Sequence, residues 1–267
     1  MSFGMGAIER VEGLSDFLRL KAEWDALYAS SGASNLYLTH AWIETWARAF
    51  KKKLVVLLRR REGKLVAALP LDCTDPKNWS TLRGETYKSG ILAASPELED
   101  FRPFFRVMLL HPGPLRRLTL HRMPDTEAFL QGITRAAGPL AGLVLRRWDF
   151  ISRWIDVGAS LDAYLAGRPG KVRQELKRKE KRFVSEIPGV TFVEITNPDE
   201  AMGVIASVEK DSWKAEEGTT IERSNGQSDF YRGVLSLSGE RTTPRTFALM
   251  REGEPIAFLF GVVHDEI

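Results

Sequence analysis

The feature that most constrains this chain is a short internal repeat. The stretch Arg61–Ala67, REGKLVA, returns 190 residues later as Arg251–Ala257, REGEPIA. In both copies a polar turn containing Gly separates two apolar runs, a pattern typical of a β-hairpin. Before each hairpin the sequence predicts the same order: a helix carrying Trp, a Gly break and a further helix. Such a repeated order at a fixed period indicates a duplicated folding unit, although the seven-residue match alone could arise by chance.

The helices are predicted from apolar spacing. In the first copy they cover Leu14–Tyr28 and Thr39–Phe50, with Thr39 as the N-cap and Trp42, Trp46 and Phe50 as an aromatic stripe expected to face the core. In the second copy Asn197 is predicted to cap a helix that carries Trp213 and ends near Gly218, and another helix covers Ser228–Leu237. The predicted strands are residues 54–58, 65–71, 115–120, 143–148, 190–195, 247–250 and 255–263, and a further helix is predicted over 125–137.

The second copy is expected to be incomplete. The first copy continues for about 85 residues beyond its hairpin, whereas the second stops a few residues after its own, at Ile267. A sheet that halted there would leave a long unpaired edge, which folded proteins avoid. We therefore expect two units, residues 1–158 and 159–267, the second a fragment or one that needs a partner.

Composition excludes several classes of protein. Fourteen Phe and seven Trp argue against disorder, and no run reaches the roughly 18 apolar residues of a membrane span. The start of the sequence, Met1 to Arg10, has no apolar stretch of the signal-peptide type. One cysteine and four scattered histidines exclude an internal disulfide and give no metal-ligand spacing, so a cytoplasmic protein without a metal is expected. Cys73 follows an apolar strand, and packing is favoured over nucleophilic chemistry.

The basic excess is confined to one predicted helix. Between Lys171 and Arg182 there are seven Lys and Arg against two Glu, although the whole chain has a net charge of only +3. Three interpretations stay open. The segment is a solvated helix with a Glu175–Lys179 pair, or it binds an anionic acceptor or carrier such as a sugar phosphate, a nucleotide-linked sugar or tRNA, or it binds a nonspecific polyanion or membrane surface.

These patterns together resemble tandem proteins of the GNAT superfamily. The resemblance is strongest to the FemAB-like group, which includes acetyltransferases associated with cellulose and exopolysaccharide biosynthesis, and it extends over nearly the whole chain. Its motifs are loose, and they are specific only together: Trp42-x3-Trp46-x3-Phe50, Leu69-Pro70-Leu71, Lys171-x-Arg173-x3-Lys177-Arg178, Ser212-Trp213-Lys214 and Pro255-Ile256-Ala257.

The resemblance implies an α/β fold of two tandem GNAT-like units, with mixed, mostly antiparallel sheets flanked by helices and the second unit truncated. It implies acyl transfer to an amine of a cell-envelope or polysaccharide precursor, from acetyl-CoA or another acyl-CoA, or from aminoacyl-tRNA in the Fem branch. The family's phosphate-binding loop, Gln/Arg-x-x-Gly-x-Gly/Ala, is absent from this sequence and is expected beyond Ile267. The first unit is therefore expected to be a degenerate scaffold, and the fragment to be inactive.

Candidate site residues follow from the same resemblance. Trp213 and Lys214 lie where the family places substrate-facing residues, although core packing of Trp213 is favoured. Glu209 is a weak candidate for the general base, and a surface position is the simpler interpretation. His40 and His264 have no partner assigned from sequence. The expected substrate-binding residues are Lys171, Arg173, Lys177, Arg178, Arg182, Trp213 and Lys214. The alternative from another class is a noncatalytic polyanion-binding module that uses the 171–182 helix.

Overall fold

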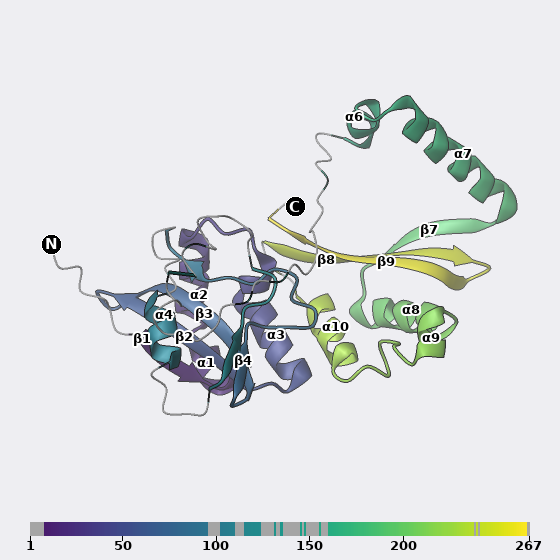
Figure 1. Cartoon of the computed structure of the whole chain (residues 1–267). Helices are drawn as coiled ribbons and strands as arrows, with labels where there is room; N and C mark the ends of the chain where they lie inside the picture. The colour runs from purple at the N-terminus through teal and green to yellow at the C-terminus, as the bar shows by residue number, and fades with distance from the viewer. Residues whose placement is uncertain are drawn as a thin grey trace.

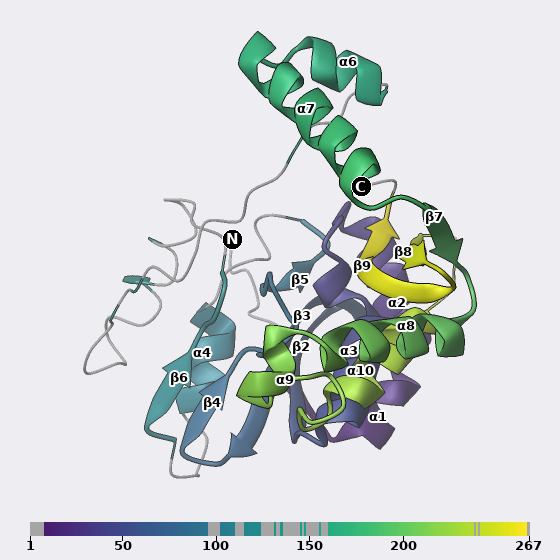
Figure 2. The same cartoon turned by 90° about the vertical axis from the view of Figure 1, so that its right-hand side faces the viewer.

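The computed structural model describes residues 8–95, 102–109, 115–123, 131, 134–135, 145, 147, 155, 160–237, 239 and 241–265. In this part of the chain two β-sheets are each flanked by helices, as Figures 1 and 2 show. The first sheet is mixed and the second is antiparallel. The predicted α/β class, with mostly antiparallel pairing, is confirmed.

The first sheet has the strand order β1-β2-β3-β4-β6, with β5 paired to β3. Only the β4–β6 pair is parallel among its described ladders. The strands are β1 (Ile8–Glu12), β2 (Leu54–Arg61), β3 (Lys64–Asp75), β4 (Asn78–Ser80), β5 (Leu92–Ala93) and β6 (Arg117–Thr119). The helices are α1 (Leu14–Arg19), α2 (Lys21–Ser30), the 3₁₀ turn η1 (Leu36–Leu38), α3 (His40–Phe50) and α4 (Arg102–Leu109).

Strand β2 is buried on both faces, which explains its continuous apolar run. Because neighbouring side chains of a strand point to opposite faces, Leu54, Val56 and Leu58 pack with α1 to α3, whereas Val55 and Leu57 pack with α4. Trp42 and Trp46 are buried in the first of these cores, as predicted.

The second sheet has the order β7-β8-β9, formed by β7 (Val190–Ile195), β8 (Thr242–Arg251) and β9 (Glu254–His264). Helices α8 (Pro198–Lys210) and α10 (Gln227–Leu235) pack on one of its faces, and α9 (Trp213–Glu217) follows α8. Two more helices, α6 (Leu161–Ala166) and α7 (Gly170–Glu186), precede β7. Asn197 caps α8 by accepting from the backbone N–H groups of Asp199 and Glu200, as predicted.

The two hairpins have the same backbone geometry. Each turn places Glu and Gly in succession at positive φ: Glu62 at 52° and Gly63 at 76°, and Glu252 at 53° and Gly253 at 87°. This combination is typical of a type I′ turn, which suits the twist of an antiparallel hairpin. Each ladder also shifts register near its turn, between Arg59 and Arg60 and between residues 249 and 250, again 190 positions apart. The order strand, two consecutive helices, helix and hairpin thus occurs twice.

Equivalent helices of the two repeats pack against each other. Helix α3 of the first repeat contacts α10 of the second through Trp42 and Phe230, whose ring centroids are 5.2 Å apart. Glycines permit this approach: a Cβ on Gly226 would lie 2.6 Å from the carbonyl oxygen of Ala49, and one on Gly233 would lie 2.5 Å from Cγ2 of Thr45. A side chain at either position would force its neighbour to shift: the backbone of Ala49 at Gly226, and the side chain of Thr45 at Gly233.

Some predicted elements differ from the structure. Strand β1 was not predicted. The helix expected over Leu14–Tyr28 is divided at Leu20 into α1 and α2. The helix expected to carry Trp213 is divided into α8 and α9, because Ser212 caps a new helix start. The predicted elements over 125–137 and 143–148 and the proposed boundary at 158/159 lie outside the continuous described ranges.

Candidate functional site

The loop between α8 and α10 is organised around the buried carboxylate of Glu209. This residue is only 5% exposed, so the interpretation as a surface Glu is wrong. One carboxylate oxygen, Oε1, accepts from the ammonium group of Lys214, and the other, Oε2, accepts from the backbone N–H of Ile221 at 2.6 Å. The side chain therefore ties α9 and the following turn to the end of α8. Both oxygens are therefore engaged by donors.

Trp213 lies on the outside of the same loop. Its side chain is 62% exposed, so the expectation that it packs in the core is wrong. Lys214 keeps its ammonium group on Glu209 while its side chain is partly exposed. These two residues are brought together on α9, as the motif Ser212-Trp213-Lys214 implies. An exposed indole beside a buried ion pair is a surface that could contact a substrate ring.

A second cluster joins the two repeats, and the sequence did not indicate it. Glu85, on the segment after β4, accepts from Gln227 Nε2 at 3.1 Å through Oε1. Its Oε2 accepts from the hydroxyls of Tyr87 at 3.2 Å and Tyr231 at 3.4 Å. We name Glu85, Tyr87, Gln227 and Tyr231 the junction cluster. Glu85 and Tyr231 are 146 positions apart, so no local sequence pattern could have revealed their contact.

The tyrosines of the junction cluster are hydrogen-bond donors at neutral pH. Burial, together with the negative charge of Glu85, raises the pKa of Tyr231 well above its ordinary value. Burial followed by the charge of Glu85 also raises the pKa of Tyr87. The cluster can therefore hold a carboxylate between the repeats and present neutral phenols, but these phenols are poorly suited to act as bases.

The predicted basic helix is present as α7, but it lies apart from both of these clusters. Its expected substrate-binding side chains are all exposed, and none of its residues is buried. The predicted Glu175–Lys179 pair forms at 3.9 Å, but Arg178 is closer to the same carboxylate, at 2.8 Å. Arg182 pairs with Glu186 at 2.7 Å. Lys171, Arg173, Lys177 and Arg182 thus project into solvent along one helix.

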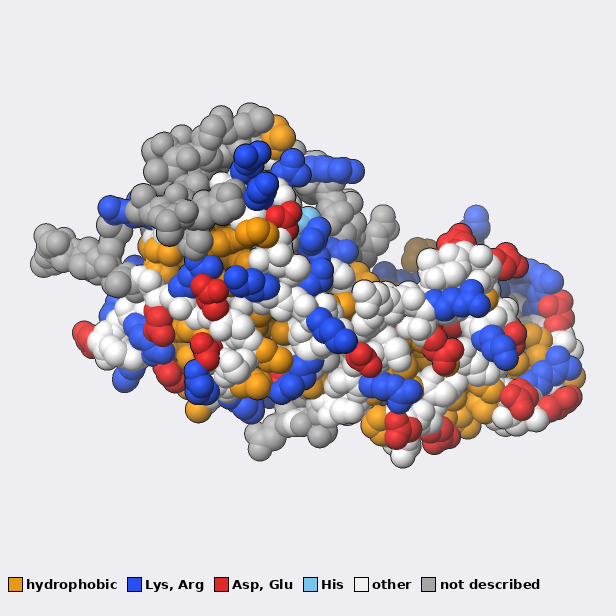
Figure 3. Space-filling model, turned by 90° about the horizontal axis from the view of Figure 1, so that it is seen from below, with side chains coloured by type: hydrophobic (Ala, Val, Ile, Leu, Met, Phe, Trp, Pro, Cys, Tyr) orange, Lys and Arg blue, Asp and Glu red, His pale blue; other side chains and the backbone are white. Residues whose placement is uncertain are grey.

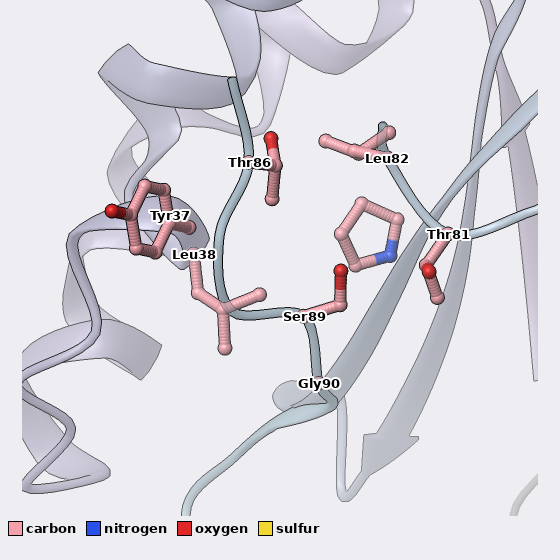
Figure 4. Close-up of a pocket in the computed structure, with 8 residues that line it drawn as sticks. Tyr37, Leu38, Thr81, Leu82, Thr86, Ser89 and Gly90 are labelled. Carbon is pink, nitrogen blue, oxygen red and sulfur yellow. The ribbon is translucent and has the colours of Figure 1, made fainter. Parts of the chain in front are cut away.

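A small cavity lies between η1 and the segment that follows β4. The cavity in Figure 4, where Thr86 and Ser89 lie beside Leu38 and Leu82, has a volume of about 10 Å³, which is room for a single water molecule. The buried hydroxyl of Ser89 lines it and has no hydrogen-bond partner among the described residues. A cavity of this size is too small for a substrate.

The remaining reactive side chains of the described ranges have structural roles. Cys73 is buried, as the packing interpretation requires, and burial raises the pKa of its thiol to about 12, so that the nucleophilic thiolate is absent near neutral pH. His40 stacks on Phe17, and Nε2 of His264 lies 2.8 Å from the hydroxyl of Tyr28. No group of His, Cys, Asp and Glu within these ranges could hold a metal ion. Nor does any described helix combine the length and the apolar character needed to cross a bilayer.

In the resemblance the phosphate loop follows the hairpin, and Asp265 is the only described residue beyond β9. Two other helix starts of this repeat are unsuitable for a pyrophosphate: α8 carries Asp199 and Glu200 in its first turn, and the start of α10 lies against the carbonyl of Ala49. No described residue is therefore assigned to the acyl carrier.

Comparisons with known proteins match the second repeat to a protein family. Residues 170–267 match the family model described as the acetyltransferase (GNAT) domain. The chain is also similar to a solved structure titled "Tandem GNAT protein from the clavulanic acid biosynthesis pathway (without AcCoA)", at 13% identity and a TM-score of 0.37. The match covers 96% of this chain and 74% of that one. No curated protein matches. The segment from the start of α7 to the end of the chain is thus similar to a GNAT acetyltransferase domain, which supports acyl transfer in general.

Proposed function

We propose that the protein is an N-acyltransferase that moves an acyl group from acyl-CoA to an amine of a cell-envelope or polysaccharide precursor. The observation that carries the proposal is the family-model match over residues 170–267. In the reaction the nitrogen lone pair attacks the thioester carbonyl, the amide bond forms, the carbon–sulfur bond breaks, and the thiol leaves after protonation. The nitrogen loses a proton to a base or to water.

One exposed side chain is proposed to act on the acceptor: the indole of Trp213 would contact its sugar or nucleotide ring. Glu209 serves first to position α9, because Lys214 and Ile221 N–H occupy its oxygens. As a general base it would have to release Lys214 before it could take a proton from the amine.

The assay described below also distinguishes two alternative functions. A FemAB-type enzyme would take its acyl group from aminoacyl-tRNA instead of acyl-CoA. A noncatalytic module would bind polyanions through α7, an alternative that its full exposure favours. The two enzymatic proposals differ in acyl donor and both predict a covalent product, whereas the noncatalytic module predicts none.

The test is thiol release from acetyl-CoA by the protein, with amino sugars and nucleotide-linked amino sugars as acceptors and the acylated amine identified by mass spectrometry. Trp213→Ala is expected to raise KM for the acceptor. Lys214→Ala and Glu209→Gln are expected to lower kcat, whereas Glu217→Gln, on the same helix and exposed, should change neither constant. Product formed only from aminoacyl-tRNA would replace the proposal with the Fem alternative. A folded protein that forms no product from either donor would refute acyl transfer.

A further inference from the structure

Helix α7 stands away from the body of the protein together with α6, as both views show (Figures 1 and 2). It has 17 residues and buries none of them. Helices in globular proteins usually owe most of their stability to the packing of an apolar face. A four- to five-turn helix without any buried side chain therefore lacks its ordinary source of stability in the described structure.

The helix nevertheless has an apolar face. Val172, Leu176 and Phe183 recur at spacings of four and seven, so they share one side of the helix. Val172 is 43% exposed and Leu176 is 47% exposed, and Phe183 is only partly buried. Leu161, at the start of α6, is also exposed. This stripe is in contact with water instead of with the core.

A column of like charges lies about 120° around the helix from the stripe. Arg173, Lys177 and Lys181 recur at i, i+4 and i+8, about 6 Å apart along the axis. In the part of the chain that the structure describes, none of the three forms an ion pair, whereas Arg178, Lys179 and Arg182 pair with Glu175 or Glu186. Like charges at this spacing destabilise a helix in water. The body differs, because Lys and Arg alternate with Asp and Glu over the face seen in Figure 3.

One environment relieves both unfavourable features at once. A helix with a basic face, a narrow apolar stripe and low overall hydrophobicity binds in the plane of a membrane interface, with its apolar side chains at the acyl boundary and its cations among anionic headgroups. A nucleic acid would neutralise the column but leave the stripe in water, and no aromatic side chain in the column offers a surface for base stacking. We propose that α7 is an interfacial helix that attaches this protein to a membrane surface rich in anionic phospholipid. The proposal does not depend on acyl transfer.

The test is cosedimentation with vesicles of phosphatidylcholine alone or with about 30% phosphatidylglycerol, at low and physiological salt. Binding should require the anionic lipid and weaken as salt screens it. The triple variant Arg173→Gln, Lys177→Gln and Lys181→Gln should lose affinity on the order of 100-fold, about fivefold for each cation removed. Leu176→Gln keeps every charge and should lose about tenfold, because the apolar contact is gone.

The matched control removes three exposed lysines from the first repeat, Lys51→Gln, Lys64→Gln and Lys88→Gln, and should retain nearly all binding. Circular dichroism verifies that each variant is folded. Three results would overturn the proposal: no binding to anionic vesicles by the folded protein, an equal loss in the control, or an unchanged affinity for Leu176→Gln. If the protein binds a single-stranded RNA oligonucleotide more tightly than the vesicles, and Leu176→Gln leaves that binding unchanged, the partner is a nucleic acid.

Discussion

A Cβ added at Gly233 tests whether the two repeats depend on the close approach of α3 and α10. The new methyl would lie 2.5 Å from Cγ2 of Thr45, which is itself buried in α3. Overpacking of this kind costs about 1–3 kcal/mol. In the middle of a helix, however, Ala is favoured over Gly by about 1 kcal/mol. The net expectation for Gly233→Ala is a loss of about 0–2 kcal/mol in the free energy of unfolding.

Two further variants separate these effects. Gly203→Ala lies in α8 with no atom within 4 Å of the added Cβ, so it reports helix propensity alone and should stabilise by about 1 kcal/mol. Thr45→Ser removes Cγ2, after which the nearest Thr45 atoms to the new Cβ are at 3.6 Å, an ordinary contact. In that background Gly233→Ala should also stabilise, giving a coupling of about 1–3 kcal/mol in the double-mutant cycle.

The assay is urea unfolding followed by tryptophan fluorescence, since Trp42 and Trp46 lie on α3, with the midpoint and slope fitted for each variant. The reasoning would be refuted if Gly233→Ala stabilised the protein as much as Gly203→Ala does in the presence of Thr45. A zero coupling energy would have the same meaning, because the distance between the helices would then not be set at this contact.

Two other predictions concern the buried histidines and the tryptophans. Burial lowers the pKa of His264 and of His40, so below the ordinary pKa of about 6.5 the unfolded chain binds more protons than the folded one. The free energy of unfolding should therefore be highest above that pH and fall on acidification. Urea midpoints measured from pH 8 to pH 5 should decline less in His264→Gln than in the unaltered protein, and an equal decline would contradict the assignment to this residue. Trp24→Ala should lower the free energy of unfolding by about 3–5 kcal/mol, because the side chain is fully buried and donates to Leu38 O at 2.8 Å. Trp213→Ala should change it by no more than about 0.5 kcal/mol. Similar losses for the two variants in thermal unfolding would show that Trp213 is buried instead of exposed.

The elements that depend on residues close together in the sequence were predicted from it. The hairpins, the caps at Thr39 and Asn197 and the helix α7 follow from spacing, turn residues and capping chemistry, and all are present. Strand β1 was missed because Ile8–Glu12 is charged at three of five positions, and it is a strand only because β2 offers it a partner from Val55 to Arg59.

The site depended on contacts that spacing does not encode. Trp24 and Trp213 hold similar places in the two repeats, yet one is buried and the other exposed, because the second helix of each pair packs differently. Glu209 became buried only because the turn at Ile221 folds back onto it. Glu85 meets Gln227 and Tyr231 through the pairing of the repeats, which no single-copy pattern contains.

The packing of α3 on α10 brings together helices that hold corresponding places in the two repeats, so the contact resembles the self-complementary face of a two-fold dimer. Such a face ordinarily evolves under a single set of substitutions that act on both sides at once. Within one polypeptide the two sides need not be alike, and here Gly226 and Gly233 lie on one side while the bulk of Thr45 and Phe50 lies on the other. A larger residue at either glycine would therefore force the helices apart, whereas a smaller residue at position 45 or 50 would leave a void between them.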